Sequence, residues 1–168
     1  MKQLQGYTIG SVAPANPRTG DRWLEISVTG AVLYGWDWVW SGSRWISPEQ
    51  WWRVSFSDIA ALTVHSFDAS NLRLLLLDFR TNAYTTATQT SANYWFFRFW
   101  ETTAQQTRSL LCEVDAIGNA PNQFVSEIVS LASLTTQPVL ELSANFVGTS
   151  NPGILRGAAS VRYQFVRP

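Results

Sequence analysis

Residues able to carry out catalysis or to hold a metal ion are sparse in this chain of 168 residues. His65 is the one histidine and Cys112 the one cysteine, so no histidine–cysteine metal site and no intrachain disulfide can form. The sequence has no GxSxG elbow, Walker loop, GxGxxG turn or DxDxDG-type calcium loop. The carboxylates that could be paired for glycoside cleavage are Asp37, Asp78, Glu101 and Asp115. Any chain of this length supplies such pairs, so we expect neither an enzyme nor a cofactor.

Aromatic residues are concentrated instead in GWDWVWSGSRW, which contains four of the nine tryptophans. Residues two apart share a face in an extended strand, so Trp36, Trp38 and Trp40 form a ladder on one side. Three interpretations are open. The indoles could fill the core of a small module. They could seal a contact between identical chains, because so small a module is marginal alone. They could also hold a sugar.

The sugar-binding interpretation depends on polar side chains beside exposed indoles. Indole faces stack on the apolar faces of pyranose rings, and polar groups nearby would bind the sugar hydroxyls. Trp45, Asp37 and Arg44 are the residues that we expect to contact a glycan in this case.

The composition bounds the class of partner. Apolar residues make up 46% of the chain and charged residues 14%, against a usual charged fraction of about 25%. With a net charge of zero, copies do not repel one another, which favours assembly. The arginines are scattered singly, so we expect no nucleic-acid partner. No apolar run is long enough for a membrane span, and the first residues lack the apolar segment of a secretory leader.

Short strand-like runs separated by turns predict an all-β chain. Residues 1–20 contain glycines and prolines and are expected to form an extended arm. Residues 21–52 predict a small three-stranded, aromatic-rich meander. Residues 53–168 contain seven or so strand-like runs and predict an antiparallel, jelly-roll-like β-sandwich. One run, Val125 to Leu134, could be helical, but its β-branched content favours a strand.

Two of the runs, LLLLDF and YWFFRFW, are apolar on both faces. Each sheet of a two-layer sandwich has one outer face, so a second apolar face would be covered by another chain. The residues expected to pack between subunits, including the tryptophan ladder, are Trp36, Trp38, Trp40, Leu75, Leu77, Trp95, Phe97 and Trp100.

The segment ANPRTGDRWLEISVTGAVLYGWDWVWSGSRWIS resembles a short module of bacteriophage tail fibres and related virion appendages. Its pattern is Asn16-Pro17, then Gly20 to Trp23, the aromatic strand Trp36 to Trp40, and the closure Gly42 to Trp45. The remainder is more loosely similar to β-sandwich domains that end fibre-like proteins of phages, especially phages of cyanobacteria. The matching pieces are Asn93-Tyr94-Trp95 and the closing 16 residues.

The resemblance implies a homotrimeric virion appendage protein without catalysis, assembled in the host cytoplasm. The chain would be a short head or tail fibre, or a component of a composite fibre. Its arm would dock on a capsid, tail or baseplate protein, and its outer domain would contact the host surface, where a glycan is a possible ligand. Residues 81–92 and 148–153 are the loops expected to carry a receptor site. The alternative is a lectin-like carbohydrate-binding module, and a hydrolase is the weakest hypothesis.

Overall fold

The fold was obtained as a computed structural model, which describes residues 2–4, 7–26, 36–70, 72–102, 107–136, 138–148 and 151–167. The chain divides into two compact units. The small-sheet unit comprises Met1–Gln50 and Gln164–Pro168, and the sandwich unit comprises Trp51–Tyr163. All regular elements within the described ranges are strands, which confirms the all-β prediction.

The small-sheet unit contains one five-stranded sheet, where a three-stranded meander was expected. In sheet order, its strands are β1 (Lys2–Leu4), β2 (Tyr7–Gly10), β3 (Arg22–Glu25), β4 (Trp36–Trp40) and β5 (Trp45–Ile46). The additional strands β1 and β2 come from the segment expected to be a free arm. β2 contains the β-forming residues Tyr7, Thr8 and Ile9 and pairs in parallel with β3. The indole Nε1 of Trp23 on β3 donates a hydrogen bond to the Gly10 carbonyl at the end of β2 (3.0 Å).

The C-terminal residues close the small-sheet unit, although the sequence assigned them to the sandwich. The Ser47 amide donates to the Phe165 carbonyl (3.0 Å), and the Phe165 amide donates to Ser47 Oγ (2.9 Å). The Arg167 amide donates to the Trp45 carbonyl (3.0 Å). Phe165 also packs against the buried indoles of this unit. Residues 164–167 therefore supply both hydrogen bonds and apolar surface that a short sheet lacks by itself.

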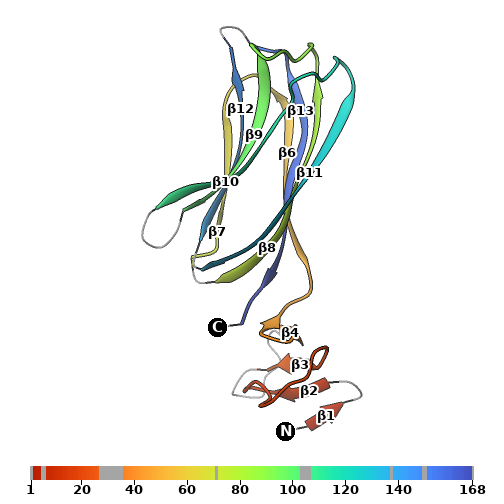
Figure 1. The fold of residues 1–168 in the computed structure, drawn as a ribbon, viewed down its shortest axis with the longest axis vertical. Coiled ribbons are helices and arrows are strands. Elements are labelled where there is room, and N and C mark those ends of the chain that lie inside the picture. Colours follow the sequence, from red (N-terminus) through yellow and green to blue (C-terminus); the bar gives the residue numbers. More distant parts are fainter. Residues whose placement is uncertain are drawn as a thin grey trace. The chain divides into compact units, whose positions relative to one another are not determined.

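The sandwich unit is built from eight antiparallel strands in two four-stranded sheets (Figure 1). These are β6 (Gln50–Ile59), β7 (Thr63–Asp68), β8 (Arg73–Thr85), β9 (Tyr94–Thr102), β10 (Arg108–Asp115), β11 (Phe124–Thr136), β12 (Val139–Val147) and β13 (Leu155–Phe165). The sheet orders are β10-β9-β12-β7 and β11-β8-β13-β6. This interleaving of consecutive strands between two sheets is an eight-stranded jelly roll of two Greek keys, as expected. The segment that could have been helical is part of strand β11.

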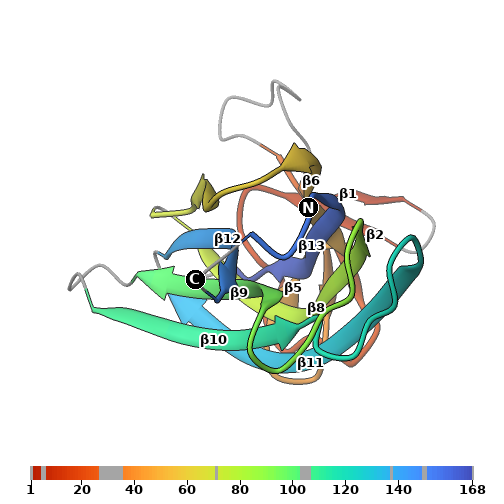
Figure 2. The same ribbon diagram turned by 90° about the horizontal axis from the view of Figure 1, so that it is seen from above.

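The core of the sandwich lies between the two sheets. Leu74, Leu76 and Phe79 of β8 are fully buried, and Phe79 stacks on Phe99 of β9 at 5.7 Å. Leu76 and Phe79 are three residues apart, which strict alternation would not allow. The β11–β8 register shifts in the same stretch, between Ser130 and Ser133. Viewed from above, β10 and β11 lie side by side along one edge of the sandwich (Figure 2).

Candidate functional site

The tryptophan ladder lies in the small-sheet unit and contributes to its core. Trp23, Trp38 and Trp45 form a buried cluster, and the partly buried Trp40 packs against it. Ring centroids of Trp23 and Trp45 are 5.7 Å apart, and the Trp38 Nε1 donates to Glu25 (2.9 Å). The side chain of Trp36 lies outside the described residues. With 5% of Trp38 exposed, its indole has little surface to offer another chain or a sugar.

The three residues expected to contact a glycan are not brought together. Trp45 is a core residue with 6% of its surface exposed. Asp37 is adjacent to the buried Trp38, so it faces the other side of the sheet, where it pairs with Arg22. Arg44 lies in the turn after β4, where its carbonyl accepts a hydrogen bond from the Ser41 amide (2.9 Å). The burial of Trp45 removes the stacking face on which this glycan site depended.

The sandwich residues that were expected to pack between subunits fall into a buried group and a half-buried group. Trp95 and Phe97 of β9 are 0% and 1% exposed and point into the core, so neither is available to another chain. Leu75, Leu77 and Trp100 are half-buried. The alternation along β9 explains the difference, because Trp100 lies an odd number of residues away from the two core positions.

The residues considered for catalysis are buried or make packing contacts and hydrogen bonds within the fold. His65 packs edge-on against the buried Phe56 at 5.6 Å. Burial raises the pKa of the Cys112 thiol to about 12, which makes it a poor nucleophile at neutral pH. Burial likewise raises the pKa of Glu101, and Asp115 accepts a hydrogen bond from the Ile117 amide (3.0 Å). In the part of the chain that the structure describes, no three His, Cys, Asp or Glu side chains are grouped so that they could hold a metal ion.

On the outer face of the sheet β10-β9-β12-β7, here called the β9 face, arginines of the same chain lie over aromatic rings of β9. Arg98 pairs with Glu113, and its guanidinium lies over the ring of Phe96 at 4.3 Å. Arg108 pairs with Glu141 at 2.9 Å, and its guanidinium lies 4.3 Å from the centre of the Trp100 ring. The aromatic side chains that made this strand apolar on both faces are therefore capped without a second subunit.

The outer face of the other sheet, here called the β11 face, has a charged cluster at its centre. Asp78 is 5% exposed and accepts hydrogen bonds from Arg80 Nε (2.9 Å) and Arg162 Nε (2.8 Å). Burial by itself would raise the pKa of Asp78, but hydrogen bonds and positive charge from both arginines outweigh it and lower that pKa. The guanidiniums of Arg80 and Arg162 lie 4.8 and 5.9 Å from the centre of the Trp51 ring.

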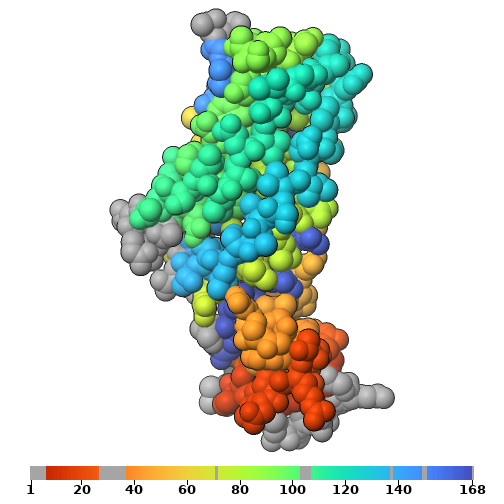
Figure 3. All heavy atoms as spheres, viewed as in Figure 1, coloured from red at the N-terminus to blue at the C-terminus, as the bar shows by residue number. Residues whose placement is uncertain are grey.

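Beside this cluster, the strand β11 presents uncovered apolar side chains. Phe124, Ile128 and Leu134 are 66%, 63% and 42% exposed. They lie opposite Tyr84, Arg80 and Leu75 in the register and so share the β11 face with the charged cluster. The strand β11 stands at the edge of its sheet, and its residues form a continuous band on the surface (Figure 3). We call Phe124, Ile128 and Leu134 the β11 stripe.

The loops expected to carry a receptor site are tied to each other. Gln89 is 1% exposed and donates from Nε2 to the carbonyls of Ala87 (2.8 Å) and Pro152 (2.9 Å). Its Oε1 accepts a hydrogen bond from the Trp95 amide (2.8 Å), and the Trp95 indole donates to the Gly153 carbonyl (2.9 Å). The connection between β8 and β9 is thus fixed against the connection between β12 and β13. The expected loop at 81–92 is also shorter, because β8 continues to Thr85.

Sequence reasoning named Leu75 and Asp78 of the β11 face but missed Trp51 and the β11 stripe. The signals were present: Phe124, Ser126 and Ile128 alternate with other residues, and Trp51-Trp52 places two indoles on opposite faces of one strand. Trp52 packs inward against Phe67 at 5.6 Å, whereas Trp51 is 50% exposed. Which of the two sheet faces stays uncovered depends on the pairing of distant strands, which alternation alone does not give.

No protein-family model and no curated protein matches this sequence. Among solved structures, similarity is found to PorU of Porphyromonas gingivalis, with 11% identity and a TM-score of 0.47, over 70% of this chain and 13% of PorU. The VP2 subviral particle of infectious bursal disease virus is similar over 88% of this chain and 38% of that one, with 9% identity and a TM-score of 0.47. A Bacillus endospore appendage protein is similar over 76% and 93%, with 10% identity and a TM-score of 0.38. Sequence identities and TM-scores this low assign neither a family nor a function to the chain.

Proposed function

We propose that this chain is a non-enzymatic structural subunit of a virion, and that copies of it associate through the β11 stripe. The observation that carries the proposal is the exposure of Phe124 and Ile128, each about two-thirds, on an edge strand. The strand has one charged residue, Glu127, in its 13 residues and contains no proline. A long edge strand with few charges and with exposed apolar side chains is a surface that chains use for pairing.

The appendage class is proposed on the resemblance of the tryptophan-rich segment to a module of phage fibres. On that basis the subunit is a short head or tail fibre, or part of a composite fibre, of a bacteriophage such as one infecting cyanobacteria. The assembled form is a homotrimer. The small-sheet unit binds a capsid, tail or baseplate partner as a folded sheet, since its first strands pair within it and do not form a free arm.

Sedimentation of the whole chain at several concentrations tests the proposal. We expect a species of three times the 18.9 kDa of one chain. Ile128→Lys places a charge in the contact and removes the burial of one large aliphatic side chain, about 1.5–3 kcal/mol. The variant should therefore weaken association at least about tenfold.

Val64→Lys is the matched control, because Val64 is 45% exposed on a strand of the other sheet. It should leave the sedimenting mass unchanged. A wild-type chain that stays monomeric at the highest concentration, or equal effects of the two lysine variants, would contradict association through the β11 stripe.

A further inference from the structure

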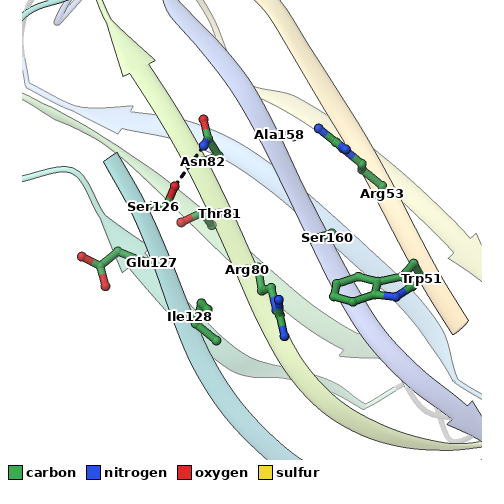
Figure 4. A pocket seen from close by; sticks show the side chains of 10 residues that line it. All are labelled: Trp51, Arg53, Arg80, Thr81, Asn82, Ser126, Glu127, Ile128, Ala158 and Ser160. Atoms are coloured by element: carbon green, nitrogen blue, oxygen red, sulfur yellow. Dashed lines mark hydrogen bonds between the residues drawn. The ribbon is translucent and has the colours of Figure 1, made fainter. Parts of the chain in front are cut away.

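A groove of about 570 Å³ crosses the middle of the β11 face. Small residues of β13, Ala158 and Ser160, lie between larger side chains on either side (Figure 4). Trp51 on β6 forms one wall, and Ile128 on β11 forms the other. A groove of this volume is within the range of pockets that bind small ligands.

The wall formed by Trp51 is held in a fixed orientation while half of its surface stays exposed. Arg80 and Arg162 lie against the ring, and Asp78 holds both guanidiniums through its two carboxylate oxygens. The indole extends from β6 toward Ser160 (Figure 4). A core indole would be buried, and an unsupported surface indole would change rotamer. This one is a preorganised planar platform, which is what a stacked ligand requires.

Polar groups line the rest of the groove. The side-chain amide of Asn82 donates to the Ser126 hydroxyl (2.9 Å) beside Ile128, and Ser160 lies near the indole (Figure 4). Arg53 follows Trp51 on the same face of β6 and is exposed, with no ion pair to any residue that the structure describes. Glu127 points away from the centre of the groove (Figure 4).

The charge of the groove is positive. Arg53 and Arg80 line the groove and Arg162 lies beside it, so three guanidiniums stand against two carboxylates, Asp78 at the centre of the face and Glu127 in the lining. A ligand that fits must have an apolar ring face for the indole, hydroxyls for serine and asparagine, and a negative charge for arginine. A sugar ring with a carboxylate has all three features.

We propose that this groove binds an acidic oligosaccharide, with one pyranose ring stacked on Trp51 and a carboxylate bound by Arg53. The site is distinct from the tryptophan cluster of the small-sheet unit. It does not rest on the proposed virion role, because all of its contacts are made within one chain. A second copy of this chain covering the groove is the competing occupant, and it lacks the concentration of carboxylates that the arginines would select, since acidic residues number 12 in 168.

Calorimetric titration of the full chain with tetragalacturonate tests the inference, and the methyl-esterified tetramer serves as an uncharged ligand of the same ring structure. We expect the acid to bind and the ester to bind at least about tenfold more weakly. Trp51→Ala should weaken binding of the acid at least about tenfold, and Trp51→Phe should weaken it less. Arg53→Gln should remove the preference for the acid over the ester while binding of the ester is retained.

Val64→Ala, on the β9 face, is the control and should bind like the wild type. Thermal unfolding followed by circular dichroism verifies that each variant is folded, and Trp51→Phe keeps the aromatic platform if the alanine variant does not fold. Absence of binding to either tetramer at millimolar concentration would overturn the inference, as would equal binding by wild type, Trp51→Phe and Arg53→Gln. A monomeric chain that binds the acid would contradict the assembly proposal and support this one.

Discussion

The two outer faces of the sandwich differ in how far their aromatic side chains are covered by arginines. On both, aromatic side chains lie outside the core and arginines stack on them. On the β9 face, Arg98 and Arg108 cap Phe96 and Trp100, and Phe96 is only 4% exposed although it points outward. On the β11 face, the arginines leave half of Trp51 exposed and do not cover Ile128.

The difference lies in where the carboxylates stand. Glu113 and Glu141 are on strands beside β9 and draw each arginine across a neighbouring ring. On the β11 face, one carboxylate, Asp78, holds two arginines at the centre of the sheet. A second carboxylate, Asp58, holds Arg156, whose guanidinium lies 5.9 Å from the centre of the Tyr84 ring on β8. Phe124 and Ile128 on the edge strand nevertheless stay 66% and 63% exposed. The aromatic rings of β9 are capped within one chain, although Val64 and Leu110 of the same face are each 45% exposed, whereas the β11 face is open to a partner at Phe124 and Ile128.

The largest expected effect comes from removing the carboxylate at the centre of the β11 face. Asp78→Ala should lower the free energy of unfolding by about 2 kcal/mol, because it removes the buried partner of two arginines that are themselves partly exposed. Glu113→Ala, on the β9 face, should cost no more than about 1 kcal/mol, since both members of its ion pair are about a third exposed. Urea unfolding of the two variants measures the difference, and equal losses would show that the two faces rest on equivalent ion pairs.

Alternation of residue types was sufficient to predict the jelly roll and the strand assignment of the segment around Ile128. It also predicted that both faces of β9 are apolar. What it did not give is which partner covers the outer face of that strand, because Glu113 and Glu141 reach Arg98 and Arg108 only through the pairing of β10, β9 and β12. A one-dimensional pattern identifies a two-sided strand but not the side chains that close it.

The small-sheet unit was predicted less well for a related reason. The tryptophans of β3, β4 and β5 identified its centre, but its other two strands come from the expected arm and its closing contacts come from residues 164–167. β2 joins by parallel pairing with β3, and Phe165 packs on the indoles from a position more than a hundred residues later. Parallel and long-range contacts of this kind leave no local signature in the sequence.

A smaller effect is expected when the cap on the β9 face is removed. Arg98→Ala should uncover the rings of Phe96 and Trp100 and cost about 1 kcal/mol, from lost cation–π contact and lost packing of the arginine stem. The variant should also bind more of a dye that reports exposed apolar surface, and so behave more like the β11 face. Arg98→Lys keeps the charge without the planar group and should fall between the two. Unchanged dye binding in Arg98→Ala would mean that the rings are covered by something other than arginine.

The smallest effect is expected from acidification, and it acts on the β11 face through Asp78. The arginines hold the pKa of Asp78 below its usual value of 3.8, so the folded chain keeps this carboxylate charged at a pH where the unfolded chain takes up a proton. Its contribution to stability is therefore complete above the usual carboxyl pKa and is lost as the pH falls through the lower folded value. One proton gives a slope of at most about 1.4 kcal/mol per pH unit. Wild type and Asp78→Asn should differ most in urea unfolding near neutral pH and converge in acid. If the gap between them instead stays constant down to about pH 2, the arginines hold Asp78 by shape and packing more than by its charge.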